Sequence, residues 1–331
     1  MADLTGRTVL HYRILSKLGE GGMGTVYKAE DQRLRRTVAL KFLSPAVFSD
    51  PTSRARFIRE AQAAAGLDHP NICAVYGMEE GEGLSFIVMA CVEGPSLTQT
   101  MAEGMALAQS LDCAIAIGEG LQCAHSHGVV HRDIKSANII RTPQGVPRIT
   151  DFGLARLEGR SRLTTPGTVM GTITAMAPEQ LMAEDADRRT DIWAFGVLLY
   201  EMLTGRKPFD RPGAQATMQA ILHETPPAPS AIDPRLPREF KWVFEKALAK
   251  ARSERYQHMD ELVTDLRAIR RRLTPEQEAV TVCRAQQSAA ATATVSPQPH
   301  LEPKWGLGWP ILAAIGAVLI AVVTLLVLLM R

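Results

Sequence analysis

The sequence predicts an α+β fold with its strands near the amino terminus, its helices after them, and one transmembrane helix at the end. Apolar and β-branched residues form strand-like runs in 12–41, 73–78 and 85–89. Glycine-containing turns separate these runs, among them the five-residue turn EEGEG at 79–83. Apolar residues recur at helical spacing in 51–67 and 107–127. Residues 310–330 then run for 21 positions without a charged side chain. Strands and helices in separate stretches indicate an α+β domain, and the last run indicates a membrane span.

The composition is that of an ordinary globular protein. Of the 331 residues, 46% are hydrophobic and 22% are charged, which is enough for one domain with a sizeable core and an additional segment. A net charge of +2 gives no reason to expect nucleic acid as a partner. The five cysteines include no CxxC pair, so we expect a reducing compartment and neither a zinc site nor a disulfide framework. Residues 1–12 contain no apolar run, so no secretory signal is expected there.

A glycine cluster in the first strand-like run has the spacing GxGxxGxV: Gly19, Gly21, Gly24 and Val26. Backbone without a Cβ atom can approach phosphate oxygens closely and present its N–H groups to them. A Rossmann dinucleotide site is the alternative interpretation of such a motif. However, a strand rather than a helix follows the glycines, and residues 37–41 form a further strand that ends in Lys41. Both features favour a phosphate-binding hairpin and favour a nucleotide role for Lys41 over a solvated charge.

The segment 131–153 gathers the chemistry that phosphoryl transfer needs. It reads HRDIKSANII, a short turn, and then DFG. Asp133 is an acceptor for a hydroxyl proton, Asn138 offers an amide oxygen, and Asp151 offers a charged oxygen. Hard oxygen ligands of this kind suit magnesium. The isoleucines around them indicate short strands that would hold a tight loop still.

This motif set resembles the catalytic core of eukaryotic-type protein kinases. The layout with a C-terminal span resembles the bacterial transmembrane, receptor-like serine/threonine kinases. The resemblance implies a two-lobed protein kinase fold, with a small β-rich N-lobe and a larger helical C-lobe. The expected parts are an N-terminal extension at 1–11 and a kinase domain at 12–273, divided into an N-lobe at 12–89, a hinge at 90–94 and a C-lobe at 95–273.

The resemblance also assigns catalytic roles to four residues. Asp133 would accept or orient the substrate hydroxyl, and Lys135 would steady the γ-phosphate, which is the pattern of serine/threonine kinases. Lys41 would contact the α- and β-phosphates. Glu60, in the helix 51–67, would pair with Lys41, whereas the alternative reading of Glu60 alone is a surface charge.

The remaining family positions surround the nucleotide. Asn138 and Asp151 would hold Mg2+, with Mn2+ as the alternative ion. Backbone groups of Ala90 and Val92 in the hinge would bind adenine next to Met89, the gatekeeper. The residues expected to contact ATP are Leu18, Gly19, Gly21, Gly24, Val26, Ala39, Lys41, Met89, Ala90, Val92 and Ile140.

Residues 151–179 resemble an activation segment, which opens with DFG and closes with APE. Its threonines at family positions are Thr164, Thr165, Thr168 and Thr172. We expect autophosphorylation at one or more of the first three, because Arg132 occupies the position of a phosphate-binding arginine. The fourth is expected to contact the catalytic aspartate and lysine. Elsewhere in the C-lobe, Asp191 is expected to brace the catalytic loop, and Arg255 is expected to pair with Glu179.

The C-terminal stretch changes in character after residue 273. Residues 274–304 are rich in Ala, Thr, Gln and Pro, so we expect a flexible juxtamembrane linker there. Residues 305–331 are expected to form the transmembrane helix, with Trp305 and Trp309 at the interface. Basic residues on the N-terminal side favour a cytoplasmic kinase domain at the plasma membrane. Relatives with this layout carry a sensor domain after the span, and the sequence leaves open whether the protein is tail-anchored without one or continues further.

The sequence therefore predicts an ATP-dependent protein serine/threonine kinase held at a membrane. Its expected partners are ATP, protein substrates, the lipid bilayer and a second copy of itself. Two alternatives stay open: a pseudokinase that serves as a scaffold, and a phosphotransferase that acts on small molecules. The complete set of catalytic residues disfavours the first, and the full activation segment disfavours the second.

Overall fold

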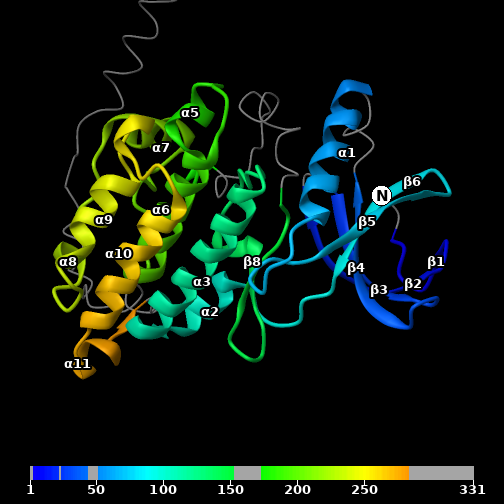
Figure 1. Cartoon of the computed structure of the whole chain (residues 1–331), viewed down its shortest axis with the longest axis horizontal. Coiled ribbons are helices and arrows are strands. Elements are labelled where there is room, and N and C mark those ends of the chain that lie inside the picture. The colour runs from blue at the N-terminus through cyan, green and yellow to red at the C-terminus, as the bar shows by residue number, and fades with distance from the viewer. Residues whose placement is uncertain (1–2, 22–23, 44–50, 153–172, 283–331) are drawn as a thin grey trace, which may run out of the picture. The chain divides into compact units, whose positions relative to one another are not determined.

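The computed structural model describes residues 3–21, 24–43, 51–152 and 173–282, with the side chains of residues 51–57 excepted (Figure 1). The four threonines of the predicted activation segment lie outside the described residues. So do most of the predicted linker and the whole predicted span at 305–331. Among the helices that the structure describes, none is both long and apolar enough to cross a membrane.

The first part of the chain folds into a six-stranded antiparallel sheet with one helix. The strand order is β1-β2-β3-β4-β6-β5. Side chains alternate between the two faces of β3, and one face packs around the aromatic rings of Tyr27, Phe42 and Phe86. The elements are β1 (Thr8–Val9), β2 (Tyr12–Gly21), β3 (Gly24–Asp31), β4 (Arg36–Leu43), α1 (Pro51–Ala65), β5 (Val75–Gly81) and β6 (Leu84–Ala90).

The hairpins of this sheet follow from their turn residues. Gly21 pairs with Gly24 across the glycine-rich turn, as the sequence predicted. The second hairpin differs from the prediction, because β5 continues to Gly81 and the turn is only Glu82 and Gly83. Both residues have positive φ, 55° and 75°, which is the conformation of a tight two-residue turn between antiparallel strands. The predicted five-residue turn at 79–83 was therefore too long.

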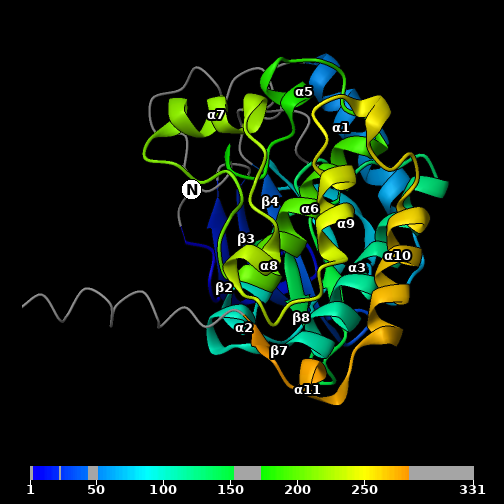
Figure 2. The same ribbon diagram turned by 90° about the vertical axis from the view of Figure 1, so that its left-hand side faces the viewer.

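The second part of the chain is mainly helical. Helix α6 is buried on nearly all sides, and α3 and α9 pack against it, with α10 alongside α3 (Figures 1 and 2). Two small antiparallel sheets pair β7 with β10 and β8 with β9. The elements are α2 (Leu97–Glu103), β7 (Met105–Ala106), α3 (Leu107–Ser126), β8 (Ile139–Arg141), β9 (Pro147–Ile149), α5 (Pro178–Leu181), α6 (Arg188–Thr204), α7 (Ala214–His223), α8 (Pro229–Ile232), α9 (Phe240–Ala247), α10 (Met259–Arg272), α11 (Pro275–Glu278) and β10 (Thr281–Val282).

Local sequence sets where these helices begin and end. The Asp187 side chain accepts the Arg189 N–H at the start of α6, and Gly205 ends that helix at φ 68°. Ser96 and Gln99 form a capping box at the start of α2. The predicted helices at 51–67 and 107–127 are confirmed as α1 and α3, each slightly shorter than expected.

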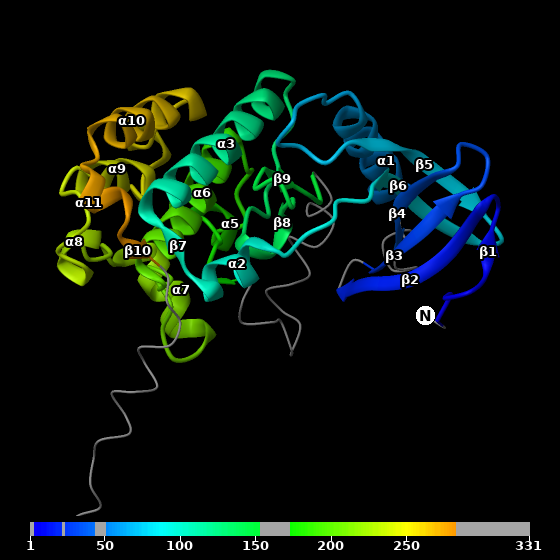
Figure 3. The ribbon, with the colours of Figure 1, turned by 90° about the horizontal axis from the view of Figure 1, so that it is seen from below.

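The start of the predicted linker is part of the folded domain. Residues 274–282 form α11 and β10 rather than a flexible chain, and β10 pairs with β7 (Figure 3). Thr274 caps α11 and accepts the Gln277 N–H, and Pro275 occupies the first helical turn. Val282 is buried. Residues 274–282 therefore belong with the folded domain, and the predicted boundary at residue 273 lies too early in the chain.

Candidate active site

The backbone of the catalytic loop, which we define as residues 131–138, is held by hydrogen bonds to Asp191. This fully buried carboxylate accepts the backbone N–H of His131 at 2.8 Å and that of Arg132 at 2.7 Å. Arg132 has φ 68°, an unfavourable conformation for a residue with a side chain, and these two hydrogen bonds hold it there. His125 Nε2 lies 2.8 Å from the same carboxylate. The predicted bracing role of Asp191 thus has a geometric basis.

The buried Asp191 is kept ionised by its neighbours. Burial alone would raise the pKa of this carboxyl, but its hydrogen bond with His125 and the backbone N–H groups outweigh burial and lower the pKa. The sequence analysis assigned no role to His125. No sequence signal reveals its role, because Asp191 lies far away in the chain.

The loop brings its three functional side chains together. Lys135 Nζ donates to Asp133 Oδ2 at 2.7 Å. Asn138 Nδ2 donates to the Asp133 carbonyl oxygen at 2.8 Å and to Oδ2 at 3.0 Å. Asp133 Oδ1 accepts no hydrogen bond from the residues that the structure describes. As far as the described residues go, one carboxylate oxygen is held in place and the other is left to accept a proton.

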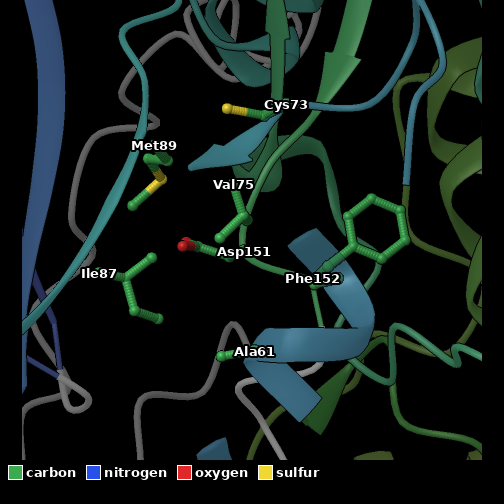
Figure 4. A pocket seen from close by; sticks show the side chains of 8 residues that line it. Ala61, Cys73, Val75, Ile87, Met89, Asp151 and Phe152 are labelled. Atoms are coloured by element: carbon green, nitrogen blue, oxygen red, sulfur yellow. The ribbon is translucent and has the colours of Figure 1, made fainter. Parts of the chain in front are cut away.

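Lys41 and Asp151 meet across the two parts of the domain. Lys41 lies on β4 with 6% of its side chain exposed, and its Nζ contacts Asp151 Oδ1 at 2.7 Å. Asp151 has φ 64°, which turns its carboxylate toward the strands of the sheet. The next residue, Phe152, is buried and packs edge-on against the His131 ring at a centroid distance of 4.7 Å. Figure 4 shows the Asp151 carboxylate pointing toward Ile87 and Met89 while the Phe152 ring points away.

Glu60 has a different partner from the predicted one. Its carboxylate accepts a hydrogen bond from Arg132 Nη1 at 2.9 Å, and the described residues show no ion pair between Glu60 and Lys41. The reason is electrostatic. The Lys41 ammonium is already neutralised by Asp151, so the Glu60 carboxylate pairs with the nearby guanidinium of Arg132. The prediction of a Lys41–Glu60 pair does not hold for this conformation.

The expected adenine site is a small apolar cluster next to the hinge. Ala39 and Met89 pack together with Cys73, and Val26, Ala90, Cys91 and Val92 pack against them. Of the other residues predicted to contact ATP, Ile140 lies on β8, and Leu18 lies half-exposed on β2. The sequence analysis did not assign Cys73 to this site. Burial raises the pKa of its thiol to about 12, so it is an apolar lining residue rather than a nucleophile.

The three glycines of the glycine-rich turn differ in whether the fold itself requires them. A Cβ atom on Gly24 would lie 1.8 Å from the Phe42 carbonyl oxygen, so the strand pairing itself demands glycine there. At Gly19 and Gly21 a Cβ atom would meet nothing within 4 Å. The fold would accept a side chain at these two positions. Close approach of phosphate oxygens is therefore the physical reason that remains for glycine at both.

The oxygen donors present fit a magnesium ion shared with a nucleotide. The Asn138 amide nitrogen is occupied by its hydrogen bonds to Asp133, which leaves its Oδ1 as the ligand atom. Asp151 adds a carboxylate. No cluster of three or more His, Cys, Asp or Glu residues in the described part of the chain could hold a metal ion by itself. Two protein oxygens completed by phosphates and water are the usual environment of Mg2+.

A buried ion pair supports the C-lobe, as predicted. Arg255 donates to both Glu179 carboxylate oxygens, at 2.7 and 2.8 Å, and both side chains are almost completely buried. Thr190 Oγ1 also donates to Glu179 at 2.8 Å. Burial would raise the pKa of Glu179, but the hydrogen bonds and charge of Arg255 outweigh it, so the pKa is lowered.

The two-lobed fold and this arrangement of residues define a protein kinase domain. The chain belongs to the protein kinase family: residues 12–266 match the family described as "Protein kinase domain". The assignment made from the motifs is thereby confirmed, as is the two-lobed fold.

The relatives are bacterial serine/threonine kinases. The probable serine/threonine-protein kinase SCO3848 of Streptomyces coelicolor is 41% identical over 265 residues, which cover 78% of this chain and 39% of that protein. PrkC of Bacillus subtilis is 37% identical over 260 residues, which cover 77% of this chain and 40% of PrkC. The crystal structure of the Mycobacterium tuberculosis PknI kinase domain matches with a TM-score of 0.66 at 31% identity, covering 81% of this chain and 100% of that one. This chain spans about two fifths of the length of SCO3848 and of PrkC.

Proposed function

We propose that this protein transfers the γ-phosphate of ATP to serine or threonine hydroxyls of protein substrates. The observation that carries the proposal is the geometry of Asp133. Lys135 and Asn138 fix one oxygen of its carboxylate, and the other oxygen accepts no hydrogen bond from the described residues. Phosphoryl transfer needs positioning and charge stabilisation more than covalent chemistry, and a fixed carboxylate at the acceptor hydroxyl supplies positioning.

Each residue then has one task. Asp133 orients the substrate hydroxyl and takes its proton. Lys135, which contacts Asp133, lies where its ammonium can stabilise negative charge on the transferred group. Lys41 binds the α- and β-phosphates when it leaves Asp151. Asn138 and Asp151 would hold Mg2+, which supplies positive charge along the phosphates when bound.

The test compares purified full-length protein with Asp133→Asn and Lys41→Met variants, using labelled ATP, Mg2+ and a generic protein substrate. We expect each variant to lose about 10²- to 10⁴-fold in kcat, as for other catalytic proton acceptors and charge-stabilising groups. Asp260→Asn and Lys241→Met make the same chemical changes at exposed positions and should keep full activity. Equal labelling by Asp133→Asn and wild-type protein would refute the proposal, and nucleotide binding without turnover would favour the scaffold alternative.

Autophosphorylation of the activation segment is the regulation that we propose. Its support is the position of Arg132, which directly precedes Asp133 in the catalytic loop. The Arg132 guanidinium is paired with Glu60 in this conformation. A phosphothreonine carries nearly two negative charges and would compete with Glu60 for this guanidinium. Mass spectrometry should find phosphate on Thr164, Thr165 or Thr168 of the wild-type protein and none on Asp133→Asn. Phosphate at the same level on both proteins would rule this regulation out.

Membrane attachment at the plasma membrane, with the kinase domain in the cytoplasm, also remains our proposal. Its support is the uncharged run at 310–330, which as a helix at ~1.5 Å per residue would cross a hydrocarbon core of roughly 30 Å. Arg284 and Lys304 on its N-terminal side favour a cytoplasmic location for the domain. Full-length protein should stay with membranes in alkaline carbonate, and deletion of 305–331 should release it. Release of both proteins would exclude the span. Association of two copies in the membrane would let one phosphorylate the other.

A further inference from the structure

The segment that follows the last long helix is bound to the kinase domain as a strap, which we define as residues 274–282. Its strand β10 pairs with β7, so that Thr281 lies opposite Ala106 and Val282 lies opposite Met105 (Figure 3). Val282 is 3% exposed and Met105 is 2% exposed. By contrast, Thr281 is exposed to solvent on the other face of the same strand. The strap is therefore held mainly through one buried side chain.

The strap completes the start of helix α3. Ala106 is the N-cap residue of α3 and has no side-chain group that could accept an N–H of the first turn. The Val280 carbonyl oxygen takes this place and accepts the Leu107 N–H at 2.7 Å. Arg270 adds ion pairs that join α10 to both elements, with Asp112 of α3 at 2.9 Å and Glu278 of the strap at 2.6 Å. Removal of the strap would leave the Leu107 N–H without the Val280 carbonyl oxygen and Arg270 without Glu278.

Two of the helices that contact the strap also hold the catalytic loop. Strand β10 packs beside α3 and α6. At its other end, about 30 Å away for a 20-residue helix, α3 carries His125. Helix α6 carries Asp191, whose carboxylate contacts His125 Nε2 and accepts the backbone N–H groups of His131 and Arg132. The relative position of α3 and α6 thus sets the geometry of the loop that carries Asp133.

We propose that the strap is a detachable positioning element for the catalytic loop, and that Val282 is its key positioning residue. With the strap bound, α3 and α6 hold His125 against Asp191, and the loop keeps its active geometry. With the strap released, α3 loses its N-terminal partners and phosphoryl transfer slows while nucleotide binding is retained. The chain continues directly from Val282 into the segment that precedes the predicted span. A pulling force on that segment, or a chemical modification of it, would therefore act on the strap before it acted on the rest of the domain. This inference rests on the proposed kinase activity.

The test uses the full-length protein with three substitutions in the strap. Val282→Asp places a charge in the buried position and should release the strand, and Val282→Ala should weaken it. Thr281→Asp introduces the same charge one residue earlier on the exposed face and is the matched control. Hydrogen–deuterium exchange at residues 105–107 reports release, and steady-state kinetics report kcat and the KM for ATP. We expect faster exchange and a fall in kcat of about two- to thirtyfold for Val282→Asp. The KM for ATP should not change, and Thr281→Asp should match the wild type.

The outcomes separate this inference from the proposed function. If Val282→Asp does not fold, the smaller changes in hydrogen exchange and kcat of Val282→Ala decide whether the strap positions the loop. Val282→Ile keeps a β-branched apolar side chain and should retain wild-type values. Faster exchange at 105–107 with an unchanged kcat would overturn the positioning role and leave a purely structural strap. Absence of any Asp133-dependent phosphorylation by the wild-type protein would instead overturn the proposed function.

Discussion

Arg255 offers the sharpest test of how this domain is held together. Its guanidinium makes five hydrogen bonds: two to the carboxylate of Glu179, and three to the carbonyl oxygens of Ala249, Arg189 and Lys250. None of its side chain is exposed. The substitution Arg255→Met keeps most of the volume of the side chain and removes its charge and every donor. Glu179 is then left as a buried carboxylate with only Thr190 as a described side-chain donor.

The expected loss of stability follows from that burial. Removal of one partner from a buried ion pair costs about 3–5 kcal/mol, because the remaining charge has no compensation. At about 2–4 °C per kcal/mol for a domain of this size, the melting temperature should fall by about 6–20 °C. A second substitution, Glu179→Gln, should recover part of the loss when it is combined with Arg255→Met, because it removes the uncompensated charge.

The assay is thermal and urea unfolding of the full chain without nucleotide. Arg235→Met is the matched control, because Arg235 also donates to both oxygens of one carboxylate, Asp233, but 61% of its side chain is exposed. Exposed pairs contribute about 1 kcal/mol or less. The loss of unfolding free energy should therefore be several-fold larger for Arg255→Met than for Arg235→Met. A loss for Arg255→Met no larger than the loss for Arg235→Met would refute the argument that burial determines the magnitude.

Three further predictions follow from the described side chains. The pKa of Glu179 is lowered in the folded protein, so the ionised carboxylate stabilises the fold fully above the ordinary pKa of 4.5. This stabilisation is lost as the pH falls through the lower pKa of the folded state, and Glu179→Gln should therefore flatten the dependence of stability on pH in that range. Iodoacetamide should label the partly exposed Cys91 before Cys73, whose thiol is buried, and equal rates would contradict the packing described for Cys73. His125→Leu should lower kcat with little change in the KM for ATP, since His125 acts on the loop through Asp191; a change in KM alone would contradict this.

The catalytic residues could be read from the sequence because their geometry is local. Asp133, Lys135 and Asn138 lie within six positions, and one tight loop is enough to bring them together. The first hairpin was equally accessible, because Gly24 has a backbone that only glycine tolerates. Where a short run of chain determines the arrangement, residue spacing carries most of the structural information.

The strap was missed because its apolar signal is too short. Only Val280 and Val282 alternate within an otherwise polar stretch, and two residues do not distinguish a strand from a linker. The signal that could have revealed it is the helix start: Thr274, Pro275 and Gln277 form a capping box with proline in the first turn. Composition over the whole stretch 274–304 concealed this local pattern.

The pairing of Glu60 could not be read from the sequence for a different reason. Two carboxylates, Glu60 and Asp151, and two cations, Lys41 and Arg132, can be combined into ion pairs in more than one way. The structure holds the set Lys41–Asp151 and Glu60–Arg132. The family motif predicts the other set, in which Lys41 pairs with Glu60. Because either carboxylate can neutralise Lys41, the sequence determines the four residues but not which pairs form.

The proposed regulation would require Lys41, Glu60, Arg132 and Asp151 to change partners. A phosphothreonine that takes Arg132 deprives Glu60 of its described partner, and Lys41 is the other cation in the cluster. Lys41 in turn must leave Asp151, whose carboxylate is needed with Asn138 to hold the metal ion. Each exchange favours the other, because the Lys41 ammonium and the Glu60 carboxylate carry opposite charges and attract each other once their present pairs are broken. Loop phosphorylation and nucleotide binding should therefore reinforce one another: the phosphorylated protein should bind Mg2+–ATP more tightly than the unphosphorylated one.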